Sequence, residues 1–397
     1  MIGWDDISKV IVGMVPLYFA LLLGYASVRW WRLFTSEQCD GINRFICLFI
    51  LPLFSFDFTA GVDPLRMNYR MIGADALSKV ATIVAFAAWW AWANLGSGGG
   101  PARPSGSLNS CVTGFSLSTL TNLLFMGVPI MRPMYSDLGV NMVVQLSVIQ
   151  SLVWFPLLLT FLEYRKMRME SLQVAAVASS SPEAAGGGSS SPDRIADERD
   201  IEQNDDSIAA ADDNGDGNTN NRRSSSSSLQ GGSSKWKFIS VVAIKLAMNP
   251  NVIAVVLGVA WALAAHWWNL RMPNVIKGSV EILSKAGTGT AMFNIGIFMA
   301  TQKKIIACGK GPAAVGMVLR FMVGPAVMAI SSLAVGLRGT LFHIAVIQAA
   351  LPQAVASFVY AKEYGLHATV ISTAVVFGTL VSLPVLIGYF AAMEYLA

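Results

Sequence analysis

The sequence is poor in charged residues, and this scarcity excludes most soluble folds. Asp, Glu, Lys and Arg make up 13% of its 397 residues, whereas soluble domains carry roughly a quarter. Hydrophobic residues reach 54%, and the mean hydropathy is +0.54. A chain of this composition is an integral membrane protein that lies in a lipid bilayer.

Other features are scarce as well. The four cysteines form no CxxC pair and the three histidines lack partners at metal-ligand spacing, so the sequence predicts neither a disulfide scaffold nor a metal site. The formal charge of +4 does not indicate nucleic-acid binding, because the basic residues flank apolar runs. No nucleotide fingerprint or nucleophile elbow occurs. We therefore predict a protein that is not an enzyme and needs no cofactor.

Apolar runs of about 20 residues, the length that spans a bilayer, occur in two sets of five. The predicted spans are Ile7–Val28, Ile42–Ala60, Met71–Leu95, Leu108–Met131, Met142–Tyr164, Val252–Trp268, Val280–Ala300, Ala313–Leu337, Leu341–Ala361 and Thr369–Tyr395. The prediction is an all-α membrane protein with ten transmembrane helices. Residues 1–164 and 237–397 hold the two five-helix halves, and residues 165–236 join them.

The connecting segment is rich in serine, glycine and aspartate from Ser179 to Ser234, a composition typical of disorder. Basic residues such as Arg165 and Lys237 flank it, so the positive-inside rule places it in the cytosol and both chain termini in a lumen or outside the cell. It is either a passive tether or a regulatory segment whose serines a kinase phosphorylates.

Two five-helix halves that are joined across an odd number of spans have opposite orientations, which predicts an inverted repeat. The fourth span of each half contains a proline, Pro129 in the first half and Pro352 in the second. A proline removes a helical hydrogen bond and frees backbone groups at membrane depth. Either these are ordinary kinks, or the two broken helices cross and their N-terminal ends bind an organic anion.

Ionisable residues inside a span are costly and therefore suggest function. Asp75 and Lys79 lie four residues apart in the third span and share one helical face. They form either a structural ion pair or a charge pair that supports a substrate cavity. Ser55 and Gln150 could add hydrogen bonds to the same cavity, although such residues also serve helix packing.

Several segments give the chain its resemblance to a known family. These segments are Asn122–Pro129, Asn249–Asn251, Met272–Ser279, Ile305–Gly309, Arg320–Val327, Gln348–Gln353 and Ala361–Tyr364. Together they resemble the plant PIN-FORMED auxin efflux carriers, and the resemblance covers nearly all of both helical halves. The short connecting segment is similar to that of the short-loop members in the endoplasmic reticulum.

The resemblance implies a ten-helix inverted-repeat fold with crossed broken helices, like that of the bile-acid sodium symporters. It also implies a homodimer, elevator movement, and export of the indole-3-acetate anion without a known sodium or proton requirement. Asn122 would contact the auxin carboxylate, with Leu124, Phe125 and Val355 close to the ligand. The residues that match the family's support site are Ser55, Asp75, Lys79 and Gln150.

Two stretches depart from the family pattern. Asn122–Phe125 stands where Asn-Thr-Leu-Val is usual, and Ala354–Ser357 stands where Gly-Ile-Val-Pro is usual. Substrate preference is the property most exposed to these changes. The sequence leaves two alternatives open, a cation-coupled symporter of another organic anion and a membrane auxin receptor. Matched helix breaks favour transport.

Overall fold

The computed structural model describes residues 4–95, 104–180, 240–302, 306 and 308–396. Within this part the chain forms helices, with one isolated backbone bridge and no named strand. The predicted all-α class is confirmed.

The described residues of the first half form eleven elements. They are α1 (Trp4–Arg29), α2 (Ser36–Phe45), η1 (Ile46–Ile50), α3 (Leu51–Ala60), η2 (Pro64–Arg66), α4 (Tyr69–Leu95), α5 (Pro104–Thr119), η3 (Leu123–Gly127), α6 (Val128–Ile149), η4 (Gln150–Trp154) and α7 (Phe155–Ser180). All of the η elements here are single π-helical turns except η2, which is a 3-10 turn. α6 contains a kink at Tyr135 and Ser136, whose backbone angles are not helical.

The second half follows a short helical stretch over residues 240–247. Its elements are α9 (Pro250–Trp268), α10 (Asn274–Thr301), α11 (Lys310–Val318), the π-helical turn η5 (Leu319–Val323), α12 (Gly324–Ala334), α13 (Gly339–Ala349), α14 (Val355–Glu363) and α15 (Ala368–Leu396). The helix α7 continues well past residue 164, where the first half was predicted to end. The rest of the predicted linker, residues 181–236, lies outside the described residues.

Within the described residues, seven helical stretches are long and apolar enough to cross a membrane. They are Ile11–Arg29, Ser36–Ala60, Tyr69–Trp92, Leu123–Met169, Pro250–Trp268, Lys310–Ala334 and Ala368–Tyr395. The predicted spans outside this set coincide with α10 and with the shorter helices α5, α13 and α14. Length and composition thus establish a multi-pass membrane protein.

Local sequence signals explain where several helices begin. The Thr35 side chain accepts from the Gln38 backbone N–H while the Gln38 side chain accepts from the Thr35 N–H, which is a capping box at the start of α2. The Asn249 side chain accepts from two N–H groups at the start of α9, and Pro250 occupies the first helical turn, where a missing N–H costs nothing. These caps fix where α2 and α9 begin.

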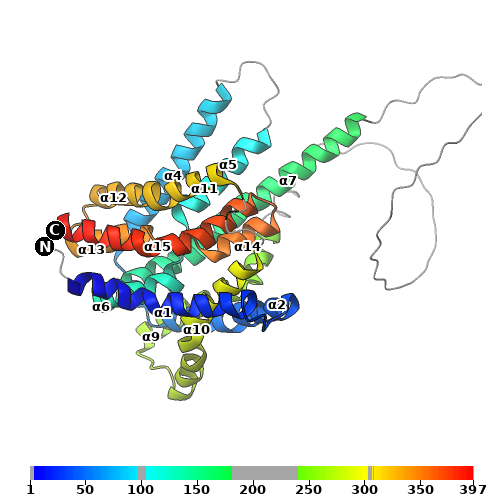
Figure 1. The fold of residues 1–397 in the computed structure, drawn as a ribbon. Helices are drawn as coiled ribbons and strands as arrows, with labels where there is room; N and C mark the ends of the chain where they lie inside the picture. Colours follow the sequence, from blue (N-terminus) through cyan, green and yellow to red (C-terminus); the bar gives the residue numbers. More distant parts are fainter. Residues whose placement is uncertain (1–3, 96–103, 181–239, 303–305, 307, 397) are drawn as a thin grey trace, which may run out of the picture.

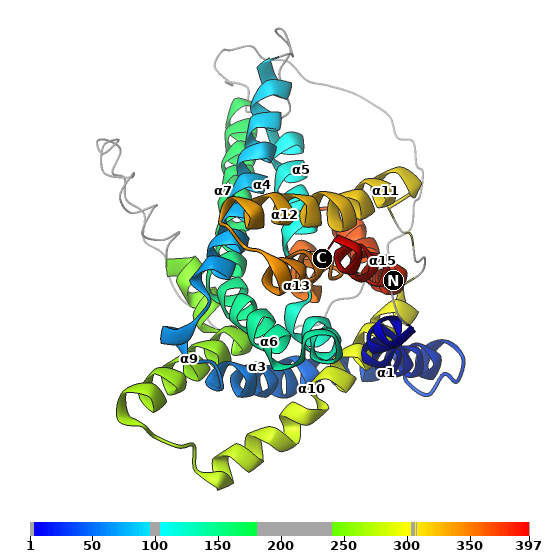
Figure 2. The same ribbon diagram turned by 90° about the vertical axis from the view of Figure 1, so that its left-hand side faces the viewer.

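The helices form two groups, which Figures 1 and 2 show from two directions. One group, called here the base group, contains α1, α2, α3, α9 and α10, and its members pack on one another. The other, the crossing group, contains α4–α7 and α11–α15, with α4, α5 and α7 running together in Figure 2. A large apolar core that includes α1, α6, α13 and α15 joins the groups.

Glycines let α1 and α10 touch along their backbones. A Cβ atom on Gly24 would lie 2.0 Å from the Phe293 carbonyl oxygen, and one on Gly296 would lie 2.0 Å from the Leu21 carbonyl oxygen. Only glycine allows so close an approach, which is the usual way that helices pack tightly in membranes. The base group is therefore held by direct backbone contact.

Candidate functional site

Two helices are interrupted near the centre of the crossing group. α5 ends before Leu120–Asn122, here called the first break, and the chain then continues as η3 and α6. α13 ends before Ala350–Ala354, the second break, and the chain continues as α14. An interrupted helix leaves unpaired carbonyl groups at one end and unpaired N–H groups at the other.

The two breaks meet through their backbones. The Asn122 N–H donates to the Pro352 carbonyl at 2.9 Å, and the Ala354 N–H donates to the Leu120 carbonyl at 3.0 Å. These bonds enclose an isolated antiparallel bridge. The predicted meeting of two broken helices is thus present as direct hydrogen bonds.

Amide side chains supply further donors to the first break. Gln150, the first residue of η4, donates through Nε2 to the Thr121 carbonyl at 2.7 Å. Gln353, inside the second break, donates through Nε2 to the Ser116 carbonyl at 3.1 Å and to the Ser357 hydroxyl at 2.7 Å. Buried carbonyl groups need such partners in a membrane, where water is absent. Gln150 was predicted to lie near the cavity, whereas Gln353 was not singled out for this role.

A buried arginine joins the two breaks. Arg320 lies in η5 and is 0% exposed. Its guanidinium donates to the Leu117 carbonyl at 3.1 Å and to the Ala349 carbonyl at 2.6 Å. Leu117 belongs to the last turn of α5, and Ala349 is the last residue of α13. One side chain therefore holds the ends of both half-helices.

Asn122 stands at the point where the helix resumes after the first break. Its backbone carbonyl accepts from the N–H groups of Met126 and Gly127, so it begins η3. Its side chain is 5% exposed and makes no capping hydrogen bond. Among the described residues no hydrogen-bond partner of the Asn122 amide occurs, so the amide is available to a ligand.

The apolar residues expected near the ligand lie on both sides of the place where the two breaks meet, here called the crossing. Leu124 is buried in the large core, and Phe125 is half-buried with its ring centroid 5.3 Å from that of Phe54 in α3. Val355 is the first residue of α14 and lines a cavity. The structure thus surrounds the crossing with an aromatic and aliphatic wall.

The first proline does not cause the first break, which corrects the prediction. Pro129 lies in the first turn of α6, after η3, and the interruption precedes it at Leu120–Asn122. Pro129 lies inside the continuous helix that η3 and α6 form, so the N–H it lacks affects that helix and not the break before it. Pro352 does lie within the second break, as predicted.

Asp75 and Lys79 form a buried ion pair in α4. Lys79 Nζ lies 2.8 Å from Asp75 Oδ2, and both side chains are almost fully buried. The ammonium also lies 5.2 Å from the centre of the Trp154 ring. The pair shares with Arg320 a cavity of about 10 Å³, which has room for about one water. The predicted shared face of the two charges is confirmed.

Ser55, expected to add a hydrogen bond to the cavity, bonds to a residue of α9. Its hydroxyl donates to the Asn251 amide oxygen in α9 at 2.6 Å, inside the base group. No described contact joins Ser55 to Asp75, Lys79 or Gln150. Of the four residues of the expected support site, the described contacts bring Asp75 and Lys79 together, while Gln150 bonds to the first break and Ser55 to α9.

A cavity of about 790 Å³ lies between the base group and the crossing group. This volume falls in the range of small-molecule sites. It is lined by Cys39, Asp40, Asn43, Asn294, Ile295, Ile297, Phe298, Thr301, Gln302, Val355, Phe358, Val359, Lys362, Glu363, Ala368, Thr369 and Ser372. The only predicted ligand residue among them is Val355.

The chain segments that flank the predicted linker meet at one cluster. Lys245 Nζ lies 2.5 Å from Glu163 Oε1 and donates to the Tyr364 hydroxyl at 2.7 Å. Burial alone would lower the pKa of Lys245, but hydrogen bonds to Glu163, Tyr364 and Glu363 outweigh it and raise that pKa. Burial raises the pKa of the Tyr364 phenol. Lys245 is therefore charged at neutral pH and ties the two halves together.

Three residues of the site were not predicted individually from the sequence. Arg320 and Gln353 were noted only within segments that carried the family resemblance, and Asn251 only as part of Asn249–Asn251. The signal for Arg320 was present, because it is a charge inside an apolar run, the same rule that identified Asp75. Gln353 carried no such signal, since a neutral amide reveals its role only through its contacts.

Known proteins are similar to this chain over nearly its whole length. Residues 9–390 match the family described as Membrane transport protein. The chain is 52% identical over 394 residues to probable auxin efflux carrier component 5a of Oryza sativa subsp. japonica, covering 99% of each chain. It is 46% identical over 396 residues to auxin efflux carrier component 5 of Arabidopsis thaliana, covering 100% of each. Auxin efflux carrier component 8 of Arabidopsis thaliana is 36% identical over 398 residues, covering 99% of this chain and 100% of that protein.

The helical fold and these similarities define a multi-pass membrane transport protein, which is a transporter and not an enzyme. Within that class the chain belongs to the auxin efflux carrier family, the PIN-FORMED proteins, on the side of the short members.

Proposed function

We propose that this chain exports auxin, as the indole-3-acetate anion, from the cytosol across the membrane. The observation that carries the proposal is the free Asn122 amide at the start of a helix that resumes beside a second broken helix. The names of the relatives, which are auxin efflux carriers at 46–52% identity, support the choice of ligand.

The crossing suits an anion because its backbone carbonyl groups already have hydrogen-bond donors, whereas N–H groups at the starts of two helices face it. The carbonyl groups at the ends of α5 and α13 are bonded to Arg320, while η3 and α14 each begin at the crossing with N–H groups of their first turn. Helix N-terminal ends carry a partial positive charge and favour carboxylates. The Asn122 amide adds a donor, and the wall that includes Phe125 suits an indole ring.

The large cavity provides the route by which the anion reaches the crossing. Val355 belongs to both, because it lines the cavity and begins α14. Lys362 and the hydroxyl groups of Thr369 and Ser372 line the cavity farther from the crossing. We assign this opening to the cytosol, since α2 and α14 lie at the same end of the molecule as the outer part of α7, where the predicted linker begins.

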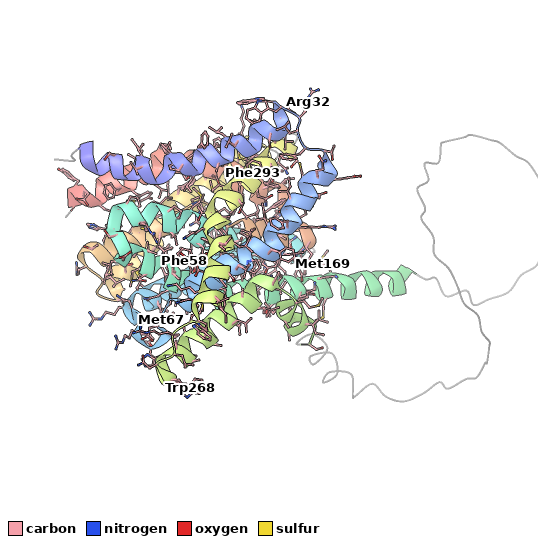
Figure 3. All side chains as sticks on the ribbon, turned by 90° about the horizontal axis from the view of Figure 1, so that it is seen from below. Arg32, Phe58, Met67, Met169, Trp268 and Phe293 are labelled. Atoms are coloured by element: carbon pink, nitrogen blue, oxygen red, sulfur yellow. The ribbon has the colours of Figure 1, made fainter. Side chains whose placement is uncertain are left out.

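A ten-span inverted repeat accounts for the described helices better than the seven apolar stretches alone. The start of α1 and the end of α15 lie at one end of the molecule in Figure 1, which supports an even number of crossings. Figure 3 draws Arg32 and Met169 toward one end and Met67 and Trp268 toward the other, as the predicted alternation demands. Pairing α5 with η3–α6, and α13 with α14, gives one broken span in each half.

Transport follows an elevator movement in this proposal. The base group, locked by the α1–α10 backbone contact, stays fixed and forms a homodimer, while the crossing group carries the anion.

The linker is cytosolic and open to a kinase, the termini are lumenal, and the membrane is that of the endoplasmic reticulum. The driving force is the concentration difference of the anion together with the membrane potential. A cation-coupled symporter of another anion and an auxin receptor are the competing functions.

Flux measurements with purified protein separate these functions. Protein in liposomes loaded with radiolabelled indole-3-acetate should release it faster than empty liposomes, equally in sodium and in choline, with or without a pH gradient. A strict sodium requirement would establish the symporter instead. Tight binding of auxin without any flux would establish the receptor.

A further inference from the structure

Arg320 holds a position that calls for a cation. Its guanidinium bonds to the carbonyl of Leu117 at 3.1 Å and to that of Ala349 at 2.6 Å, and the side chain is 0% exposed. These carbonyls lie at the C-terminal ends of α5 and α13, where a helix carries partial negative charge. Neither carbonyl has a backbone donor among the described hydrogen bonds outside helices.

No carboxylate neutralises this charge directly. Within the described residues Arg320 makes no ion pair, and the nearby Asp75 is already bonded to Lys79 at 2.8 Å. The three side chains therefore carry one net positive charge. A buried charge without a carboxylate partner is costly, so the two helix ends must supply the compensation.

Coupled transporters fill such a place with a dissolved ion. In many of them the carbonyl groups of unwound helices and the C-terminal ends of half-helices coordinate sodium. Here the same kind of carbonyl oxygen atoms contact the guanidinium of Arg320, a cation that is part of the chain. Gly324, one turn after Arg320, lets α12 approach the end of α5 closely, because a Cβ atom there would lie 2.4 Å from the Ser118 carbonyl oxygen.

We propose that Arg320 is a built-in cation of the crossing, which ties the C-terminal ends of α5 and α13 together and makes a dissolved monovalent cation unnecessary. It is a positioning residue, since it acts on the two helix ends and not on the transported molecule. The proposal rests on the proposed function only in the experiments that measure auxin flux. Thermal stability tests it independently.

The test compares Arg320→Met with Arg320→Lys and with Arg338→Met, a control in the exposed turn before α13. The Tm of each purified protein is measured in sodium, lithium, potassium and choline chloride at equal ionic strength. The wild type and Arg338→Met should have the same Tm in all four salts. In choline Arg320→Met should lose about 4 °C or more, and sodium or lithium should restore at least half of that loss.

Arg320→Lys keeps the positive charge, so it should retain most of the Tm and most of the auxin flux in choline. An Arg320→Met protein whose Tm responds to no cation would overturn the proposal, as would a wild type that needs sodium for its stability. If Arg320→Met fails to fold, Arg320→Lys is compared with the uncharged variant Arg320→Gln. Equal losses of Tm in these two variants would overturn the proposal. Absence of auxin flux in the wild type would overturn the proposed function and leave the salt dependence of Tm as the measure of Arg320.

Discussion

The two breaks in the crossing group look equivalent in the chain but are built differently. The second break contains Pro352, which cannot donate a hydrogen bond, while the first break contains no proline. The first is instead surrounded by donors from elsewhere, namely Gln150, Gln353 and Arg320. Partners for the freed backbone groups, and not proline alone, allow a helix to stop at membrane depth.

The first break also depends on the second more than the second depends on the first. Gln353 belongs to the second break but its side chain serves the end of α5 before the first. At the second break the Ala349 carbonyl accepts from the shared Arg320, and the Ala354 carbonyl accepts from the nearby Ser357 hydroxyl of α14. Damage to the surroundings should therefore affect the first break more than the second.

The largest effect is expected where α12 packs on the end of α5. Gly324→Ala would place a Cβ atom 2.4 Å from the Ser118 carbonyl oxygen, and relieving such overpacking should cost about 3 kcal/mol. Gly316→Ala is the matched control, since its Cβ atom would meet the Leu117 side chain at an ordinary 3.8 Å. Thermal unfolding of both variants measures the difference. Equal Tm values would show that the contact at Gly324 is not rigid.

A smaller effect is expected from the two amides. Gln353→Leu removes bonds to Ser116 and Ser357 and should cost about 2 kcal/mol, while Gln150→Leu removes one bond, to Thr121, and should cost about 1 kcal/mol. Tm and auxin flux of both variants should fall in that order. The reverse order would contradict the claim that the second break supports the first.

The smallest effects distinguish the two prolines. Pro352→Ala frees the chain in the second break and should cost about 0.4–1 kcal/mol through the unfolded state. Pro129→Ala has the same entropic cost, but the new N–H lies inside the continuous helix that η3 and α6 form, where one added hydrogen bond returns about 1 kcal/mol. Its Tm and flux should thus stay near those of the wild type. A larger loss in Pro129→Ala would restore that proline as the cause of the first break.

Much of this fold could be read from the sequence because membrane spans leave strong apolar signals. The ends of α1 and α9 lie within a few residues of the predicted spans, and the shared face of Asp75 and Lys79 followed from helical spacing. The second break was found because Pro352 marks it. These are local properties of the chain.

The remaining features depend on contacts between distant segments. The first break has no breaker residue of its own, so its place was assigned to Pro129 by mistake. The partner of Ser55 is Asn251, in the other half of the chain. The π-helical turns that contain Gln150 and Arg320 re-aim these side chains, and no sequence pattern announces them. Such pairings become visible only when the two halves are packed.

The most direct test of the account is the binding of auxin to Asn122. The amide has no other partner among the described residues, and a hydrogen bond to a charged group is worth about 1.5–3 kcal/mol. Asn122→Ala should therefore raise the Kd for indole-3-acetate by roughly ten- to a hundredfold with the Tm unchanged, in a titration of purified protein. The uncharged auxin ester should bind weakly to both proteins. An unchanged Kd in Asn122→Ala, or an ester that binds the wild type as tightly as the acid, would contradict an anion site at the crossing.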